Sequence, residues 1–230
     1  MPDARLIAII GAESTGKTWL ARELAAHLAT ATGQRSCWVS EHLRDWCDTH
    51  GRTPRPDEQA AIAACQSDRV AEAARHHDWV VCDTTALMTA VYSRYLFGDA
   101  SLDAQAWAAH AQVHVTLLTA LDLPWQADGL QRDGAHVREP VDALLREMLQ
   151  ARAWPYAVVH GEGAARLQAA VDAVGARLPL QAGAARIATP TSGLFTRWTE
   201  TSADDATPAR SWWCDCCDVP KLERALRAAR

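Results

Sequence analysis

Five short apolar runs alternate with stretches of helical spacing along this chain. The apolar runs cover residues 6–10, 37–39, 79–83, 113–118 and 156–159. Runs of this kind are typical of strands that are buried on both faces of a sheet. Apolar and small residues recur at helical spacing over residues 19–31, 56–77, 87–96, 140–151 and 164–178. Strands that alternate with helices predict an α/β fold with a five-stranded parallel sheet flanked by helices.

The periodic pattern ends near residue 180. Residues 181–210 are rich in Ala, Thr, Ser, Pro and Gly and show little periodicity, which indicates a linker or a loosely packed extension. We therefore expect one domain over residues 1–180 and a C-terminal linker and tail over residues 181–230. A chain of this length can bury one substantial core.

Charge and hydropathy narrow the range of partners. The formal net charge is -5, which argues against a broad nucleic-acid-binding surface. No stretch approaches the roughly 20 apolar residues that a transmembrane helix needs, so no membrane partner is expected. The first apolar run is better explained as a strand than as a cleaved signal peptide. The cysteines are odd in number and several lie in apolar surroundings, which favours a reducing, cytoplasmic location over a disulfide framework.

A P-loop directly follows the first predicted strand. Its spacing, G-x-x-x-x-G-K-[ST], is matched by Gly11, Ala12, Glu13, Ser14, Thr15, Gly16, Lys17 and Thr18. In this motif backbone N–H groups cradle phosphate oxygens, the lysine reaches the β- and γ-phosphates, and the hydroxyl residue binds Mg²⁺. Only two of the 23 basic residues of the chain are lysines, and one of them is Lys17. A compact ammonium suits this position, because a planar guanidinium would fit the phosphate cradle poorly. We expect ATP to bind at Gly11, Glu13, Ser14, Thr15, Gly16, Lys17 and Thr18.

The P-loop alone predicts only that a nucleoside triphosphate binds. The guanine-reading pattern Asn/Thr-Lys-x-Asp is absent, because the only other lysine is Lys221. The chain also has little room for a helicase or for a typical AAA⁺ lid domain. A small-molecule kinase is therefore the favoured class. Such an enzyme needs a phosphate cradle, Mg²⁺, a carboxylate that positions the acceptor hydroxyl, and cations near the transferred phosphoryl group.

Two carboxylates at strand ends are candidates for positioning the acceptor and Mg²⁺. Glu41 follows the second predicted strand, and Asp83 ends the third. The carboxyl ends of parallel strands meet at one edge of a sheet, so we expect both to converge with Asp122 and the P-loop on one cleft. Asp83 would contact Mg²⁺, together with Thr18, or the acceptor; Glu41 would contact the acceptor hydroxyl. The alternatives are a carboxylate at a helix N-terminus for Glu41 and an N-cap for Asp83.

Residues 128–138 contain glycines and charges without apolar periodicity, which predicts a mobile lid. We expect Arg132 and Arg138 in this segment to close on the phosphates and to stabilise the charge of the transferred group. A solvated surface loop is the alternative for either arginine.

Four further segments form a set with a definite order and spacing. They are Glu41-His42-Leu43-Arg44-Asp45-Trp46, Ile62-Ala63-x-x-Gln66, Cys82-Asp83-Thr84 with Thr89 beyond it, and Leu117-Leu118-Thr119-x-x-Asp122-x-Pro124-Trp125-x-x-Asp128-Gly129-x-x-Arg132. Over residues 5–178 the chain thereby resembles the ribosylnicotinamide kinase domain of the NadR family, and the last segment is much more specific than the P-loop. The resemblance implies phosphorylation of nicotinamide riboside by ATP to give nicotinamide mononucleotide.

The chain departs from the family pattern at three points. Asp83-Thr84-Thr85 stands where the family usually has Asp-Thr-Asp, which removes one carboxylate. Glu41-His42-Leu43-Arg44 stands where the pattern is nearer to Glu-Tyr-Ala-Arg, which removes an aromatic side chain. The chain also begins at the kinase strand, so we do not expect the DNA-binding and adenylyltransferase activities of the family's multi-domain members.

The substrate that the resemblance implies carries a pyridinium cation. Its pocket should offer aromatic faces and carboxylates. The aromatic candidates are Trp46, Tyr92 and Trp125, and core packing is the alternative for each of them. The carboxylate candidates are Glu41, Asp45 and Asp83, to which the resemblance adds Asp122 and Asp128.

Other functions stay open at this point, as does the oligomeric state. The same fold would serve a kinase for another nucleoside or small hydroxyl compound, or a nucleotide-dependent regulatory ATPase whose tail contacts a partner. The tail contains Cys214, Cys216 and Cys217, which could bind Zn²⁺. Structural zinc sites typically use Cys-x₂₋₄-Cys pairs, and no clean second pair exists, so a packed or redox-labile tail is favoured over zinc.

Overall fold

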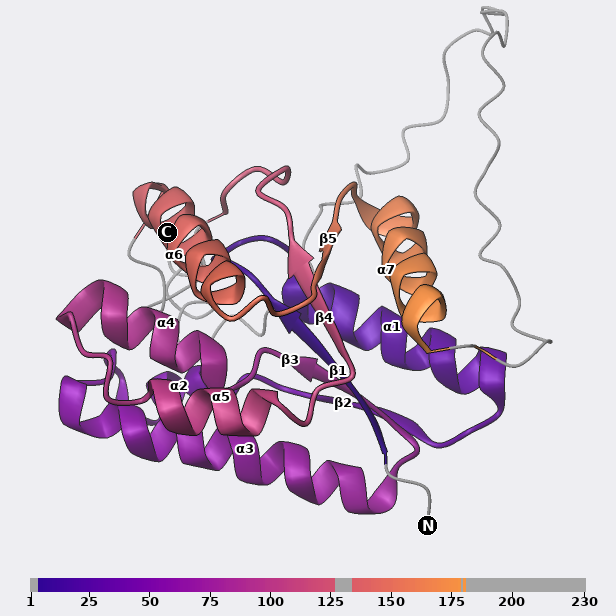
Figure 1. The fold of residues 1–230 in the computed structure, drawn as a ribbon, viewed down its shortest axis with the longest axis horizontal. Helices are drawn as coiled ribbons and strands as arrows, with labels where there is room; N and C mark the ends of the chain where they lie inside the picture. The colour runs from indigo at the N-terminus through magenta and orange to yellow at the C-terminus, as the bar shows by residue number, and fades with distance from the viewer. Residues whose placement is uncertain (1–3, 127–133, 179, 181–230) are drawn as a thin grey trace, which may run out of the picture. The chain divides into compact units, whose positions relative to one another are not determined.

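The computed structural model describes residues 4–126, 134–178 and 180. In this part of the chain, a parallel sheet has the strand order β2-β3-β1-β4-β5 (Figure 1). The strands are β1 (Arg5–Ile10), β2 (Ser36–Val39), β3 (Trp79–Asp83), β4 (Val115–Thr119) and β5 (Ala157–Val159). The expected α/β fold with a five-stranded parallel sheet is confirmed. The tail over residues 181–230 lies outside the described residues, so the division at residue 180 stays a prediction.

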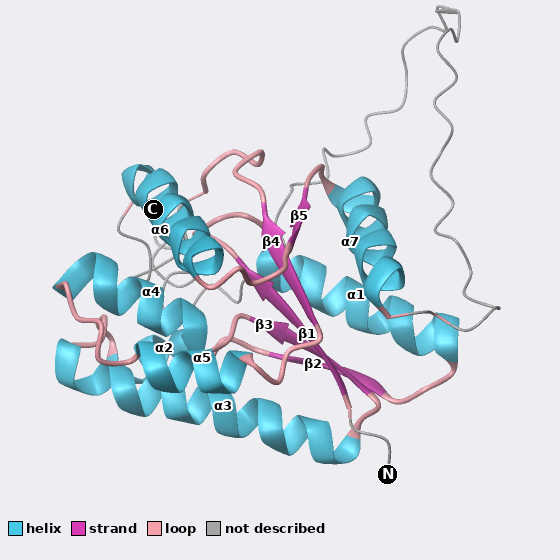
Figure 2. Cartoon of the chain, in the orientation of Figure 1, coloured by secondary structure: helices cyan, strands magenta, loops and turns pink. Residues whose placement is uncertain are grey.

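Helices cover both faces of the sheet (Figure 2). They are α1 (Lys17–Thr32), α2 (His42–His50), α3 (Gln59–His76), α4 (Ala86–Phe97), α5 (Asp103–His110), α6 (Arg138–Ala151) and α7 (Gly163–Arg177), with 3₁₀ turns η1 (Pro56–Glu58) and η3 (Ala135–Val137). α1 and α7 pack on one face of the sheet, and α3 to α6 pack on the other. α2 lies against α3.

The predicted elements are present within a few residues of their expected bounds. The helix expected over residues 56–77 is divided into η1 and α3. The strand expected from residue 113 begins at Val115, because the backbone N–H of Val113 still bonds the carbonyl oxygen of His110 at the end of α5. The hydrophobic pattern does not predict α2 or α5, which are both short.

Side chains of β1 enter two separate cores, which explains why its apolar run is continuous. Ile7 and Ile9 belong to a cluster with the buried leucines of α1, whereas Ala8 and Ile10 belong to a second cluster with α4, α5 and α6. All four side chains are fully buried. A strand whose alternate residues are buried on opposite faces needs apolar residues at every position. The P-loop therefore starts from a central strand that is buried on both faces of the sheet.

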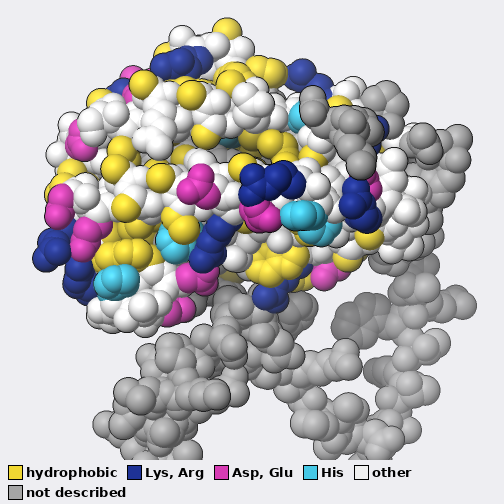
Figure 3. All heavy atoms as spheres, turned by 90° about the horizontal axis from the view of Figure 1, so that it is seen from below, with side chains coloured by type: hydrophobic (Ala, Val, Ile, Leu, Met, Phe, Trp, Pro, Cys, Tyr) yellow, Lys and Arg dark blue, Asp and Glu magenta, His cyan; other side chains and the backbone are white. Residues whose placement is uncertain are grey.

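Charged side chains of both signs are interspersed on the face of the molecule shown in Figure 3. Ion pairs join elements that are distant in sequence, such as Arg35 to Asp78 at 3.1 Å and Arg69 to Asp45 at 2.5 Å. Exposed pairs of this kind contribute about 0 to 1 kcal/mol each, so the fold depends mainly on its cores. Within the described ranges, every helix is too short or too polar to cross a membrane.

His110 is a buried imidazole that links α4 to β4. Its Nδ1 lies 3.1 Å from the Thr85 hydroxyl, and its Nε2 lies 3.0 Å from the Thr116 hydroxyl. The indole N–H of Trp154 donates a hydrogen bond to the same Thr116 hydroxyl at 3.0 Å. Burial lowers the pKa of His110 from 6.5 to about 4. The folded chain therefore requires the neutral form of this imidazole.

We expect acid to destabilise the fold through His110. Because its pKa is lowered in the folded state, its stabilising contribution is complete above about pH 6.5 and is lost as the pH falls toward 4. Between pH 7.5 and 5 the free energy of unfolding should fall by about 2 kcal/mol on this account. His110→Gln should reduce that fall, as measured by urea unfolding at both pH values. His76→Gln, on an exposed part of α3, should leave the fall in the free energy of unfolding unchanged. The prediction would be contradicted if His110→Gln lost as much stability between pH 7.5 and 5 as the wild type does.

Candidate active site

The P-loop joins β1 to α1 and has the shape of an anion cradle. Gly16, which precedes α1, has φ 75°, and Ser14 has φ 55°, so the backbone makes left-handed turns here. The Lys17 ammonium donates a hydrogen bond to the carbonyl oxygen of Ala12 at 2.7 Å. The Thr15 hydroxyl donates to the same oxygen at 2.8 Å. The first backbone N–H groups of α1 and the positive end of its dipole are therefore in place to receive a phosphate.

β4 supports the P-loop from the side. The hydroxyl of Thr119, which is fully buried, lies 2.7 Å from the Thr15 hydroxyl and donates to the carbonyl oxygen of Ile10 at 3.2 Å. Gly11 has φ 145° and passes close to this hydroxyl, so that a Cβ on residue 11 would lie only 2.2 Å from Oγ1 of Thr119. The close approach of the two segments therefore requires glycine at position 11.

Gly11→Ala should weaken ATP binding at least about tenfold, because the new methyl group must displace either Thr119 or the phosphate-binding backbone. The Kd for ATP measured by titration calorimetry checks this. Gly33→Ala is the matched control, since Gly33 also has a positive φ of 67° but no atom within 4 Å of the site of its Cβ. The control should lose some stability and keep its ATP affinity. An unchanged Kd in Gly11→Ala would show that the contact is unimportant.

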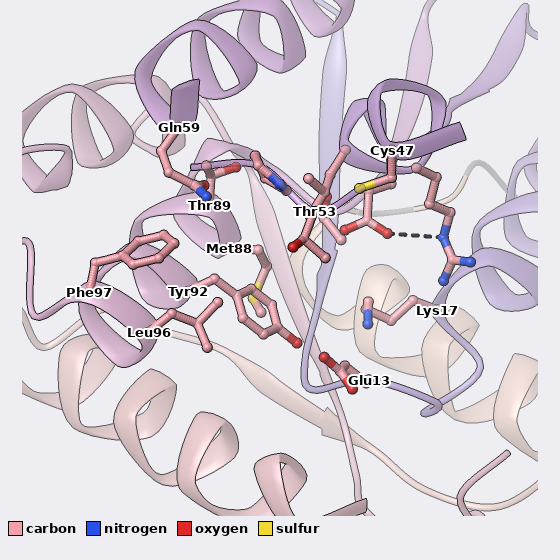
Figure 4. A pocket seen from close by; sticks show the side chains of 15 residues that line it. Glu13, Lys17, Cys47, Thr53, Gln59, Met88, Thr89, Tyr92, Leu96 and Phe97 are labelled. Carbon is pink, nitrogen blue, oxygen red and sulfur yellow. Dashed lines mark hydrogen bonds and ion pairs between the residues drawn. The ribbon is translucent and has the colours of Figure 1, made fainter. Parts of the chain in front are cut away.

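A cavity of about 290 Å³ opens between the P-loop and α4 (Figure 4). The P-loop contributes Glu13 and Lys17 to its lining, the start of α2 contributes Glu41 and Arg44, and α4 contributes Met88, Thr89, Tyr92, Leu96 and Phe97. Figure 4 shows Leu96 and Phe97 of α4 on the side of the cavity away from Lys17. Its volume is just below the range of small-molecule sites, which begins at about 300 Å³.

Glu41 reaches this cavity from the N-terminus of α2. It occupies the N-cap position, but its side chain makes no capping bond and instead accepts a hydrogen bond from Nε of Arg44 at 3.1 Å. Gln66 of α3 is 2% exposed and holds the backbone on both sides of Glu41. Its amide accepts from the N–H of His42 at 2.7 Å and donates to the carbonyl oxygen of Ser40 at 3.3 Å. Gln66 therefore positions Glu41, a role that the sequence analysis missed.

Asp83 lies at the end of β3 and is only 1% exposed. Neither of its carboxylate oxygens has a hydrogen-bond partner of good geometry in the described chain. Burial and the nearby Glu41 carboxylate raise the pKa of Asp83 above its usual value. The Thr18 hydroxyl and the positive charges of Lys17 and Arg44 oppose this rise. A buried carboxylate in this state is stabilised by any cation that reaches it.

The surroundings of Asp83 fit Mg²⁺. Asp83 does not cap α4, since Thr85 occupies the N-cap position and accepts from the N–H of Leu87 at 3.4 Å. Mg²⁺ in kinases usually binds through one or two carboxylates together with substrate phosphates. Over the described residues there is no group of three or more His, Cys, Asp or Glu side chains that could hold a metal by itself. Asp83 and Thr18 would therefore hold the ion together with the phosphates of ATP.

Of the residues predicted to bind the acceptor, the cavity brings together Glu41 and Tyr92, with Asp83 close to Glu41. Asp45 and Trp46 are outside its lining. The Asp45 carboxylate pairs with Arg69 of α3, and the Trp46 ring stacks on His50 with 3.9 Å between centroids. Trp125 is also outside the lining and is partly buried. The roles of these residues in acceptor binding stay predictions.

Asp122 takes part in an ion pair with a buried arginine, which the sequence analysis did not foresee. Arg166, in the first turns of α7, is 1% exposed and donates to the Asp122 carboxylate at 3.0 Å. Its guanidinium also donates to the carbonyl oxygens of Gly161 at 2.7 Å, Thr15 at 2.8 Å and Ala120 at 3.3 Å. Burial lowers the pKa of Arg166, and the Asp122 charge opposes this. This Arg166 clasp joins the P-loop to the ends of β4 and β5.

The segment after β4 runs across the P-loop. The N–H of Gln126 donates to the Ser14 hydroxyl at 2.8 Å, and Arg138 donates to the carbonyl oxygen of Leu123 at 2.9 Å. Arg138, predicted to be a lid cation, thus holds this segment. The remaining predicted residues lie outside the described residues: Asp128, Arg132, Cys214, Cys216 and Cys217.

Comparisons with known proteins agree with this fold. Two similar solved structures are NadR protein in complex with NAD and AMP-PNP, with 18% identity and a TM-score of 0.60, and NadR protein in complex with NR, with 18% identity and a TM-score of 0.63. The matches cover 76% and 77% of this chain but 49% and 52% of those chains, so this chain spans about half their length. No curated protein matches it. A family model described as an AAA domain matches residues 6–166, which include the P-loop, β2 to β5 and all of β1 except its first residue, and the chain therefore belongs to the AAA domain family.

Proposed function

We propose that this protein is an ATP-dependent kinase that phosphorylates nicotinamide riboside to nicotinamide mononucleotide. The observation that carries the proposal is the composition of the cavity, which unites Lys17 of the P-loop and the Glu41 carboxylate with the aromatic side chains of α4. Further support comes from the fold, because the NadR structures that it resembles contain NR in one case and a nucleotide analogue, AMP-PNP, in another.

The nucleotide half of the site consists of the P-loop and its neighbours. ATP would place its β- and γ-phosphates against the N–H groups at the start of α1, and Lys17 would exchange its bond with the Ala12 carbonyl for the phosphate oxygens. Mg²⁺ between Thr18 and Asp83 would neutralise the charge of the triphosphate. Among the described residues, Arg44 adds a further cation to the lining of the cavity.

The acceptor half of the site consists of Glu41 and the wall of α4. The oxygen of the acceptor hydroxyl would form a bond to the γ-phosphorus of ATP, and Glu41 would receive the proton of that hydroxyl. The bond between the γ-phosphorus and the oxygen of the β-phosphate would break, which releases ADP. The ring of the substrate would lie along Tyr92, whose aromatic face attracts a pyridinium cation. Carboxylates at Glu13 and Glu41 add attraction for the same positive charge.

The test is an ATP-consumption assay over nicotinamide riboside, uridine and thymidine, with the phosphorylated product identified by mass spectrometry. We expect turnover with nicotinamide riboside and little with the other two nucleosides. Lys17→Met protein from a parallel preparation controls for contaminating kinases. If another nucleoside is phosphorylated faster than nicotinamide riboside, that nucleoside is the acceptor and the proposed substrate is wrong. Binding of ATP without phosphorylation of any acceptor would favour a regulatory ATPase instead.

A further inference from the structure

One side of the cavity carries polar groups without charge. Gln59, the first residue of α3, is 3% exposed but lines the cavity together with Thr89 of α4, which is 7% exposed. Figure 4 shows both on the side of the cavity away from Lys17. Among the described residues, none is hydrogen-bonded to the Gln59 amide. A nearly buried amide is therefore left with its donor and its acceptor for a bound molecule.

The position of Gln59 is fixed by ion pairs at the residue before it. The Glu58 carboxylate accepts two hydrogen bonds from the Arg52 guanidinium, at 2.8 and 2.6 Å, and one from the N–H of Arg55 at 2.8 Å. The Arg52 guanidinium also lies over the Trp46 ring, 4.9 Å from its centroid. These contacts tie α2 to η1 and to the start of α3. The backbone that carries Gln59 is thus anchored before a ligand arrives.

The charges of the cavity are on the other side. Glu13 and Lys17 come from the P-loop, and Glu41 from the start of α2. Figure 4 shows Phe97 of α4 on the side of Gln59, and the Tyr92 ring between the two sides with its hydroxyl toward Glu13. An acceptor whose hydroxyl lies at Glu41 would therefore extend its ring along the apolar wall. The group on the far edge of that ring would then come next to Gln59.

We propose that Gln59 reads a primary carboxamide on the acceptor and rejects a carboxylate at the same position; this inference rests on the proposed function. A primary amide offers one carbonyl oxygen and one NH₂ group, and Gln59 offers the same pair, so the two amides match in two N–H···O bonds. A carboxylate offers acceptors alone. It would face the Gln59 carbonyl oxygen and leave a buried polar group unpaired.

The experiment compares nicotinamide riboside with nicotinic acid riboside, which has a carboxylate in place of the carboxamide. Wild-type protein should show a kcat/KM at least about tenfold higher for the amide. Gln59→Met, an apolar change of similar length, should raise the KM for nicotinamide riboside about tenfold and reduce the preference for the amide, with the KM for ATP unchanged. Gln59→Glu should keep the preference, because its carboxylate accepts from the amide NH₂ but repels a second carboxylate.

Gln150→Met, on the exposed surface of α6, makes the same chemical change away from the cavity and should behave as wild type. The inference is overturned if wild-type protein does not discriminate between the two ribosides, or if Gln59→Met discriminates as wild type does. Phosphorylation of neither riboside by wild-type protein would instead overturn the proposed function.

Discussion

Replacing Lys17 with methionine should lower kcat/KM for phosphorylation at least about 10³-fold, since it removes the cation that meets the transferred phosphoryl group. Methionine keeps a stem of similar length, so the local packing of this residue, which is 9% exposed, should change little. The fold should survive, because the ammonium bonds the carbonyl oxygen of Ala12 within the loop itself rather than a core element. Initial rates and a thermal unfolding curve on the same preparation check both parts of this expectation.

Lys17→Arg is the informative companion variant. It keeps the charge but replaces a compact ammonium with a planar guanidinium that is too wide for the cradle. We expect it to lose nearly as much activity as Lys17→Met. A kcat/KM of Lys17→Arg within tenfold of the wild-type value would mean that the positive charge alone suffices. A similar kcat/KM in Lys17→Met would show that Lys17 has no part in the proposed reaction.

Asp83→Asn should have opposite effects on activity and on stability. The rate of phosphorylation should fall at least about 100-fold, because the proposed Mg²⁺ site loses its carboxylate. In the absence of ligands the variant should be more stable at pH 8, by about 1 to 3 kcal/mol, because a buried carboxylate whose ionised form is disfavoured is removed. Urea unfolding with and without Mg²⁺-ATP measures the second effect.

The sign of the pH dependence follows from the raised pKa of Asp83. The folded state disfavours the ionised form, so the penalty grows as the pH rises above the usual value of 3.8 and is largest once the group is fully ionised. The advantage of Asp83→Asn should therefore be larger at pH 8 than at pH 5. Asp78→Asn is the control of opposite sign, since Arg35 lowers the pKa of Asp78. Its stability should be lower than that of wild type at pH 8; a uniform gain in both variants would contradict this account.

The sheet could be predicted from the sequence because its strands are mainly apolar, in short runs without helical spacing. β1 and β3 are buried along nearly their whole length, and this leaves a continuous run that a helix surface would interrupt. The P-loop was predictable for a different reason, because its chemistry depends on local backbone geometry and therefore on local sequence. Its position after β1 and before α1 is as expected.

The helices α2 and α5 could not be predicted in the same way. α2 has nine residues, of which only Cys47 is buried, and α5 has eight. Helices of this length are marginal by themselves and form because neighbouring elements support them. In α2 that support includes Gln66, whose amide bonds the backbone of His42 across 24 positions of sequence.

The candidate site could also be predicted only in part. Glu41 and Asp83 could be expected to lie close together, because both lie at the carboxyl ends of parallel strands, at one edge of the sheet. That Asp122 pairs with Arg166 depends on a contact across 44 residues, which no local pattern records. Gln59 could not be identified from the sequence either. A glutamine at the start of a helix does not indicate a binding site until the cavity that it lines is known.

The Arg166 clasp also bears on how the domain is made. Arg166 and Thr15 are separated by 151 residues, so the P-loop leaves the ribosome long before its last support has been synthesised. Contacts of such separation form late, after the intervening chain has collapsed. A nascent chain that ends before α7 should therefore hold ATP poorly even though its motif is complete.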